Sequence, residues 1–222
     1  MSAEPTVVPV PPGGPVSLSQ LARAQLSPAT NDVLRQVGER AGGTPAWRNR
    51  KRREMQDLFA LVELAPAGRL SIEMLDPSEV LRVMVRLRVP VPCMLKPPAG
   101  ELAIAPFALL GISYPEAATR QPLPGFAFVQ ILQPSHVWHA NVSPAFNNLC
   151  LGAQLPAGIR LTEVVLLAYA ALSMQAVMFD PHDAAGVLNR EAAHFWQHNT
   201  HRLPLSKTPF LGKDNTVAEA QP

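Results

Sequence analysis

The chain has 222 residues, of which 47% are hydrophobic and 16% charged, and its formal net charge is +2. This length and composition allow one domain of ordinary size with a buried core, and the nearly balanced charge does not indicate a nucleic-acid partner. Two cysteines, Cys93 and Cys150, are too few for a disulfide framework. No secretory signal pattern opens the sequence. We therefore expect a cytoplasmic protein whose thiols stay reduced.

Residues 1–43 predict a proline-rich, partly disordered N-terminal extension. Five prolines and Gly13-Gly14 lie within the first 16 residues, and proline fixes the backbone and removes amide donors. Residues 17–39 could form one or two short helices before Gly42-Gly43 interrupts the chain. Thr44-Pro45 then predicts a helix start, with a capping residue followed by proline at the first helical position.

The helix that begins at Thr44 has one apolar and one basic face. The basic face carries five cations: Arg48, Arg50, Lys51, Arg52 and Arg53. Such a face is either solvated or a docking surface for an acidic partner. Few aromatic residues are interleaved with the charge, so nucleic acid is the weaker third interpretation.

Alternating apolar residues predict about four strands, near residues 70–75, 81–89, 102–112 and 126–132, with proline-rich loops between them. The second strand alternates apolar residues with Arg82, Arg86 and Arg88, which predicts a basic outer face. A helix is expected over residues 161–179. It is apolar nearly all round, as expected for a helix packed across a sheet, and shorter than the ~20 residues of a bilayer span.

Asp180-Pro181 ends that helix, and a last helix is expected over residues 189–198. Residues 204–222 are expected to be a flexible tail. The order of elements predicts an α+β fold, in which one antiparallel meander packs on a long helix with further helices at both ends. Residues 44–203 would form this domain.

The stretch from His136 to Cys150 is the candidate site. It is a polar loop between an apolar strand and the long helix, and it ends on a cysteine. Cysteine is a strong nucleophile, but a cysteine between Leu149 and Leu151 can equally be a small core residue. Cys93 has no polar neighbours of this kind, and we expect it to be structural.

Two kinds of cysteine chemistry are compatible with these residues. A hydrolase needs a histidine base for the thiol and an oxyanion donor. An acyl carrier needs a neutral oxyanion donor, such as Asn141, and an acid group for the incoming amine, such as Asp183. In a carrier, His139 would hold the loop. Zinc held by His136, His139 and Cys150 is a poor fit, because structural zinc takes four ligands with short paired spacings.

The segments His139-Ala140-Asn141 and Asn148-Leu149-Cys150-Leu151 resemble the signature of ubiquitin-conjugating enzymes, which is His-Pro-Asn followed about ten residues later by an Ile-Cys-Leu-like site. Residues 160–167, 180–183 and 188–193 are similar to the segments that follow in that family. Tyr114-Pro115 and residues 122–126 are similar to its proline-rich passage before the last strand. The helix from Thr44 resembles its first helix.

The resemblance implies a ubiquitin-conjugating fold and a thioester on Cys150. It further implies that Asn141 stabilises the oxyanion, that His139 shapes the loop, and that Asp183 orients or deprotonates the attacking lysine. The basic helix face, with Arg50, Lys51 and Arg53, would bind the activating enzyme. The implied partners are that enzyme, a ubiquitin-like modifier and a target protein, without a metal, an organic cofactor, a nucleic acid or a membrane.

The sequence also departs from the family pattern. Ala140 replaces the family's proline, and the tryptophan usually found after the cysteine is missing from residues 152–160. These departures imply a divergent member, such as those in bacterial operons that conjugate ubiquitin-like modifiers, where a role in antiviral defence is conceivable. Two alternatives remain: a non-catalytic binding module of the same fold, and a cysteine hydrolase with His139 or His182 as its base.

Overall fold

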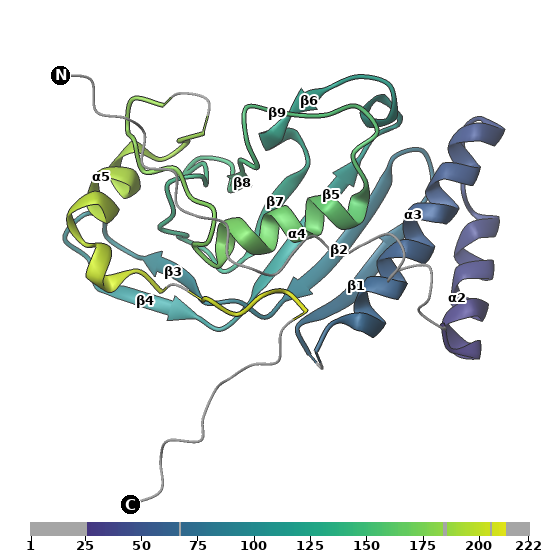
Figure 1. Ribbon diagram of the computed structural model, residues 1–222, viewed down its shortest axis with the longest axis horizontal. Helices are drawn as coiled ribbons and strands as arrows, with labels where there is room; N and C mark the ends of the chain where they lie inside the picture. The colour runs from purple at the N-terminus through teal and green to yellow at the C-terminus, as the bar shows by residue number, and fades with distance from the viewer. Residues whose placement is uncertain (1–25, 67, 184–185, 205, 212–222) are drawn as a thin grey trace, which may run out of the picture.

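The centre of the molecule is a five-stranded antiparallel sheet with helix α4 lying across one face (Figure 1). The computed structural model describes residues 26–66, 68–183, 186–204 and 206–211. The sheet order is β1-β2-β5-β7-β8. Its strands are β1 (Leu70–Asp76), β2 (Leu81–Leu87), β5 (Ala108–Tyr114), β7 (Val129–Gln133) and β8 (Asn148–Leu149). The expected α+β class with an antiparallel sheet is confirmed.

A separate hairpin, β3 (Val91–Met94) with β4 (Leu102–Ala105), lies between β2 and β5 in the chain. The single strand expected over residues 102–112 is therefore wrong. It is divided into β4 and β5 at Pro106, which has no amide hydrogen for a sheet. A third small pair joins β6 (Leu123–Pro124) to β9 (Gln154–Leu155).

Strand β2 has the expected two faces. Leu81, Val83, Val85 and Leu87 are buried toward the helices. Arg82 and Arg86 are exposed on the opposite face, as the alternation predicted.

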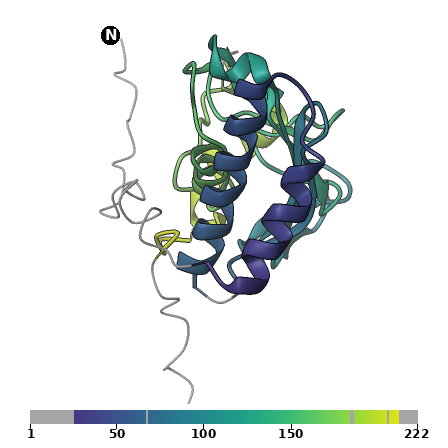
Figure 2. The ribbon, with the colours of Figure 1, turned by 90° about the vertical axis from the view of Figure 1, so that its right-hand side faces the viewer.

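Helix α3 (Pro45–Leu64) begins where the sequence indicated. The Thr44 hydroxyl accepts a hydrogen bond from the Trp47 amide at 3.2 Å, and proline occupies the first helical position. Helix α2 (Pro28–Glu39) lies beside it (Figure 2) and buries Leu34 in the core. Part of the expected N-terminal extension is thus a packed helix, whereas residues 1–25 lie outside the described residues.

Helix α4 (Leu161–Leu172) is shorter than the helix expected over residues 161–179. Ser173 ends it, and Met174 follows with a φ of 60°. Met174 turns into a second apolar cluster with Met94, Trp138, Ala192 and Trp196. The helix therefore ends early because tertiary packing outweighs helical propensity.

Helix α5 (Arg190–His198) is close to expectation and starts at Asn189, whose side chain accepts from the Ala192 amide. Residues 206–211, expected in a flexible tail, pack along α4. The Tyr169 hydroxyl donates to the Thr208 carbonyl at 2.8 Å, and Phe210 meets the Tyr169 ring edge-on. Residues 212–222 lie outside the described residues.

Candidate functional site around Cys150

Asn141 and Cys150 stand opposite each other on two antiparallel segments. The Cys150 amide donates to the Asn141 carbonyl at 2.8 Å, and the Ser143 amide donates to the Asn148 carbonyl at 2.9 Å. These two bonds flank the bridge between Val142 and Leu149. Directly opposed residues of an antiparallel pair place their side chains on the same face, and the backbone of this hairpin puts Asn141 and Cys150 at opposed positions.

His139 holds this hairpin in place. Its Nδ1 accepts from the Asn141 amide at 3.1 Å, so the ring proton lies on Nε2, which donates to the Ala171 carbonyl of α4 at 3.0 Å. The ring is fully buried, and burial lowers the pKa of His139 to about 4. Both nitrogens of a neutral ring are thus occupied. His139 is a loop clamp, and it is unsuited to take a proton from Cys150.

The Asn141 side chain connects the hairpin to the chain before α5. Its Nδ2 donates to the Gly186 carbonyl at 2.9 Å, and the amides of Leu188 and Asn189 both donate to the Ala140 carbonyl. Within the described part of the chain, the buried Asn141 Oδ1 has no hydrogen-bond partner. The Asn141 amide group therefore anchors the hairpin to the segment before α5 through its Nδ2.

The Cys150 side chain is buried, with 2% of the residue exposed. Its Sγ donates to the Gly152 carbonyl at 3.4 Å. Burial raises the pKa of the Cys150 thiol, and the negative charge of Asp183 raises it further. The structure thus brings Asp183 within electrostatic reach of the thiol, although the two residues are far apart in sequence.

The three residues that were considered and judged a poor fit for zinc do not come together. His136 is exposed, with a φ of 57°, while His139 is buried against α4. Among the residues that the structure describes, no group of three or more His, Cys, Asp or Glu side chains is placed to hold a metal ion.

The basic face of α3 differs from expectation at Lys51. The residue is fully buried, and its Nζ donates to the carbonyls of Pro77, Ser78 (2.6 Å) and Glu79 (3.4 Å). The solvent-facing position expected for Lys51 is therefore wrong, because the turn after β1 offers carbonyl oxygens to the ammonium group. Burial lowers the pKa of Lys51.

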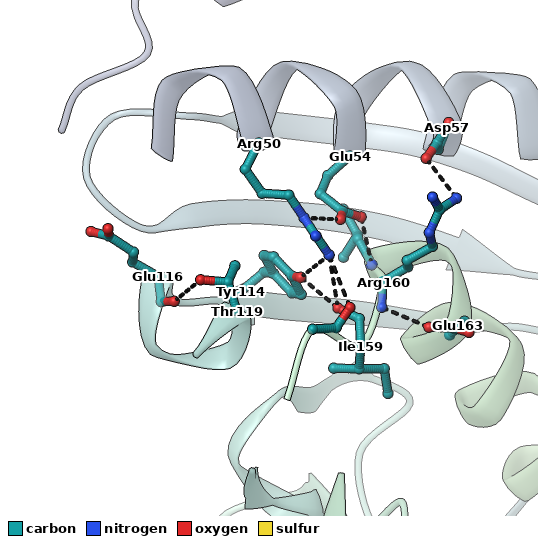
Figure 3. Close-up of polar contacts among 11 residues, drawn as sticks. Arg50, Glu54, Asp57, Tyr114, Glu116, Thr119, Ile159, Arg160 and Glu163 are labelled. Carbon is teal, nitrogen blue, oxygen red and sulfur yellow. Dashed lines mark hydrogen bonds and ion pairs between the residues drawn. The ribbon is translucent and has the colours of Figure 1, made fainter. Parts of the chain in front are cut away.

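Arg50 also points inward, toward the start of α4 (Figure 3). Its Nε pairs with Glu54 at 2.5 Å, and its Nη2 donates to the Tyr114 hydroxyl at 3.0 Å and to the Gly158 carbonyl at 3.0 Å. Glu54 accepts from the Leu161 amide at 2.7 Å. Of the three residues expected to bind the activating enzyme, only Arg53 is exposed.

Sequence reasoning missed two features of the site. The Gly186 carbonyl receives the Asn141 amide, and a backbone acceptor leaves no mark on residue type. The close contact of Gly125 with Gly152 could have been suspected only from the two glycines themselves.

None of the helices within the described ranges combines the length and apolarity that a membrane span requires. Comparisons of the chain with models of protein families, with curated proteins and with solved structures find no match.

Proposed function

We propose that Cys150 accepts a ubiquitin-like modifier as a thioester and transfers it to an amine of a target protein, in the manner of ubiquitin-conjugating enzymes. The observation that carries the proposal is the opposition of Asn141 and Cys150 across an antiparallel pair. This opposition supports the proposal because side chains at opposed positions project to the same face, so a neutral amide would lie near the thiol, where the oxyanion of a tetrahedral intermediate would form.

The reaction is two acyl transfers. The Cys150 thiolate attacks the thioester that links the modifier to its activating enzyme, a new C–S bond forms, and the enzyme's thiolate leaves. A lysine amine then attacks the Cys150 thioester, a C–N bond forms, and the C–S bond breaks. The amine gives its proton to a base, for which we propose Asp183, and the Cys150 thiolate is regenerated. Energy enters at the activating enzyme, so no cofactor is needed here.

The state of His139 favours a carrier over a hydrolase. A histidine paired with the thiol as its base would also activate water and discharge the thioester. His139 is the nearest histidine in sequence, and both of its nitrogens are occupied in hydrogen bonds. This removes His139, one of the two histidines considered as the base of a hydrolase.

The order of the strands supports a ubiquitin-conjugating-like fold. Strands β1, β2, β5 and β7 pair in chain order as an antiparallel meander, with the β3–β4 hairpin inserted after β2. Helix α4 follows the candidate cysteine and lies across the sheet (Figure 1). We propose that the protein works in a reducing cytoplasm, which keeps the thiol from being oxidised.

The burial of Cys150 favours a second candidate, a non-catalytic binding module of the same fold. A residue with 2% exposure must be uncovered before a protein thioester can reach it. In a binding module, Cys150 would remain a core residue throughout.

One experiment separates the two candidates. The protein is incubated with ATP, a cognate activating enzyme and its modifier, and analysed on non-reducing gels beside the Cys150→Ser and Cys93→Ser variants. A carrier forms an adduct that reductant removes, Cys150→Ser forms a reductant-stable ester, and Cys93→Ser behaves as wild type. Absence of any adduct, while the thiol remains unreactive to alkylation in the folded protein, would identify the binding module.

A further inference from the structure

The backbones of Gly125 and Gly152 touch beside the candidate cysteine. A Cβ atom on Gly125 would lie 2.1 Å from the Gly152 oxygen and 2.8 Å from its nitrogen. Both are backbone atoms that cannot rotate away. Position 125 therefore accepts no side chain unless residue 152 moves.

The two segments are held together on both sides of this contact. Leu123 pairs with Leu155 and Pro124 with Gln154, and the Leu151 amide donates to the Gly125 carbonyl at 3.4 Å. Gly152 has a φ of 128°, which side chains disfavour. The path of the chain just after Cys150 is thus set by a neighbouring segment that the glycine at 125 lets approach.

The contact between Gly125 and Gly152 is linked to the Cys150 thiol by the Gly152 carbonyl oxygen. The Gly152 oxygen that faces Gly125 is also the acceptor for the Cys150 Sγ. A displacement of residue 152 therefore moves the carbonyl that accepts the hydrogen bond of the thiol.

We infer that Gly125 is a positioning residue for Cys150: the absence of a side chain at position 125 lets the Gly152 carbonyl lie where it accepts the hydrogen bond of the thiol. The inference rests on the proposed role of Cys150 as the reacting group. A contact that served packing alone would change stability but leave the reactivity of the thiol in the folded protein unaltered.

The test is the rate of alkylation of the full chain by iodoacetamide across a range of pH, in a Cys93→Ser background so that one thiol is read. Gly125→Ala displaces residue 152 and with it the carbonyl hydrogen-bonded to Sγ, so the midpoint of the pH profile shifts. Each unit of that shift changes the thiolate fraction about tenfold below the midpoint. Gly111→Ala is the control, since its Cβ would lie 3.4 Å from the flexible end of Leu132. A Gly125→Ala profile that coincides with that of the control overturns the inference.

A second pair of variants serves if Gly125→Ala does not fold. Gly152 and Gly158 both have positive φ, and a Cβ atom at either position would enter open space. Alanine is disfavoured by the backbone at both positions, more so at Gly152 with its φ of 128° than at Gly158 with its φ of 79°, but only Gly152→Ala moves the carbonyl that is hydrogen-bonded to the thiol. A shifted profile in Gly152→Ala alone supports the inference, and equal profiles overturn it. Iodoacetamide requires no protein partner, so this result is independent of whether a modifier is ever loaded.

Discussion

The Nε2 of His139 donates a hydrogen bond to the Ala171 carbonyl, 3.0 Å away, and so joins the cysteine hairpin to the last turn of α4. The bond needs a neutral ring whose proton lies on Nε2, since Nδ1 accepts from the Asn141 amide. Protonation of the ring would put a proton on Nδ1, which would then face the amide hydrogen of Asn141 and could no longer accept its hydrogen bond. The geometry of the site is therefore tied to the protonation state of one buried histidine.

The first prediction is a loss of stability in mild acid. The folded-state pKa of His139, about 4, lies below its ordinary value of 6.5, so the unfolded chain binds the proton first as pH falls. The stability that depends on a neutral His139 is present above pH 6.5 and is lost as pH falls toward 4. The free energy of unfolding should therefore fall by roughly 2 kcal/mol between pH 7 and 5. Urea denaturation at several pH values measures this. His139→Gln should flatten the profile, while exposed His194→Gln should keep the wild-type slope.

The second prediction separates the two steps at Asn141. Asn141→Ala should leave loading of Cys150 nearly intact and slow transfer to lysine by roughly 10²-fold, as expected when one oxyanion donor is lost. Single-turnover discharge of preloaded protein onto free lysine provides the measurement. Asn148→Ala, in the neighbouring strand β8, is the control. If loading and transfer fall by the same factor, Asn141 acts by anchoring Gly186 and the oxyanion role is wrong.

Local patterns were enough to predict the parts of the fold that depend on neighbours in sequence. The start of α3 was readable because Thr44 and Pro45 satisfy the needs of a helix end by themselves. The hairpin from Asn141 to Cys150 spans ten residues, and the resemblance to a family signature had related these two residues.

Contacts from distant segments explain what the sequence could not show. Lys51 occupies a polar position of the helical pattern, but the carbonyl of Pro77, 26 residues along the chain, receives its ammonium group. Helix α4 ends early where the Gln175 side chain donates to the Ser206 and Thr208 carbonyls. Periodicity cannot foresee such partners, because they are backbone atoms brought close by the fold.

The third prediction concerns the polar cluster between α3 and α4 (Figure 3). Glu54→Ala would leave the partly buried Arg50 without its carboxylate and the Leu161 amide without its acceptor, at a cost of about 3 kcal/mol in the free energy of unfolding. Tyr114→Phe removes hydrogen bonds to Arg50 and Ile159 and should cost about 1 kcal/mol.

Chemical denaturation at neutral pH measures both losses. Glu63→Ala, an exposed glutamate on the same helix, is the matched control and should change stability by less than about 0.5 kcal/mol. A Glu54→Ala protein as stable as this control would show that the cluster does not hold α3 to α4.

The last prediction redirects the test of activating-enzyme docking to side chains that reach the surface. Reversal of Arg50 or Lys51 would disrupt the interior, so a loss of loading would not report on docking. Arg48 and Arg53 are exposed on α3, and the double change to Glu should slow loading roughly tenfold at low salt, because complementary charge accelerates association.

The Lys96→Glu, Arg190→Glu double variant is the control, because it makes the same change in net charge at exposed positions outside α3. Discharge of preloaded protein should be unaffected in both variants, and the loading defect should shrink as salt screens the charges. Equal loading by the two double variants would assign the basic face of α3 to solvent.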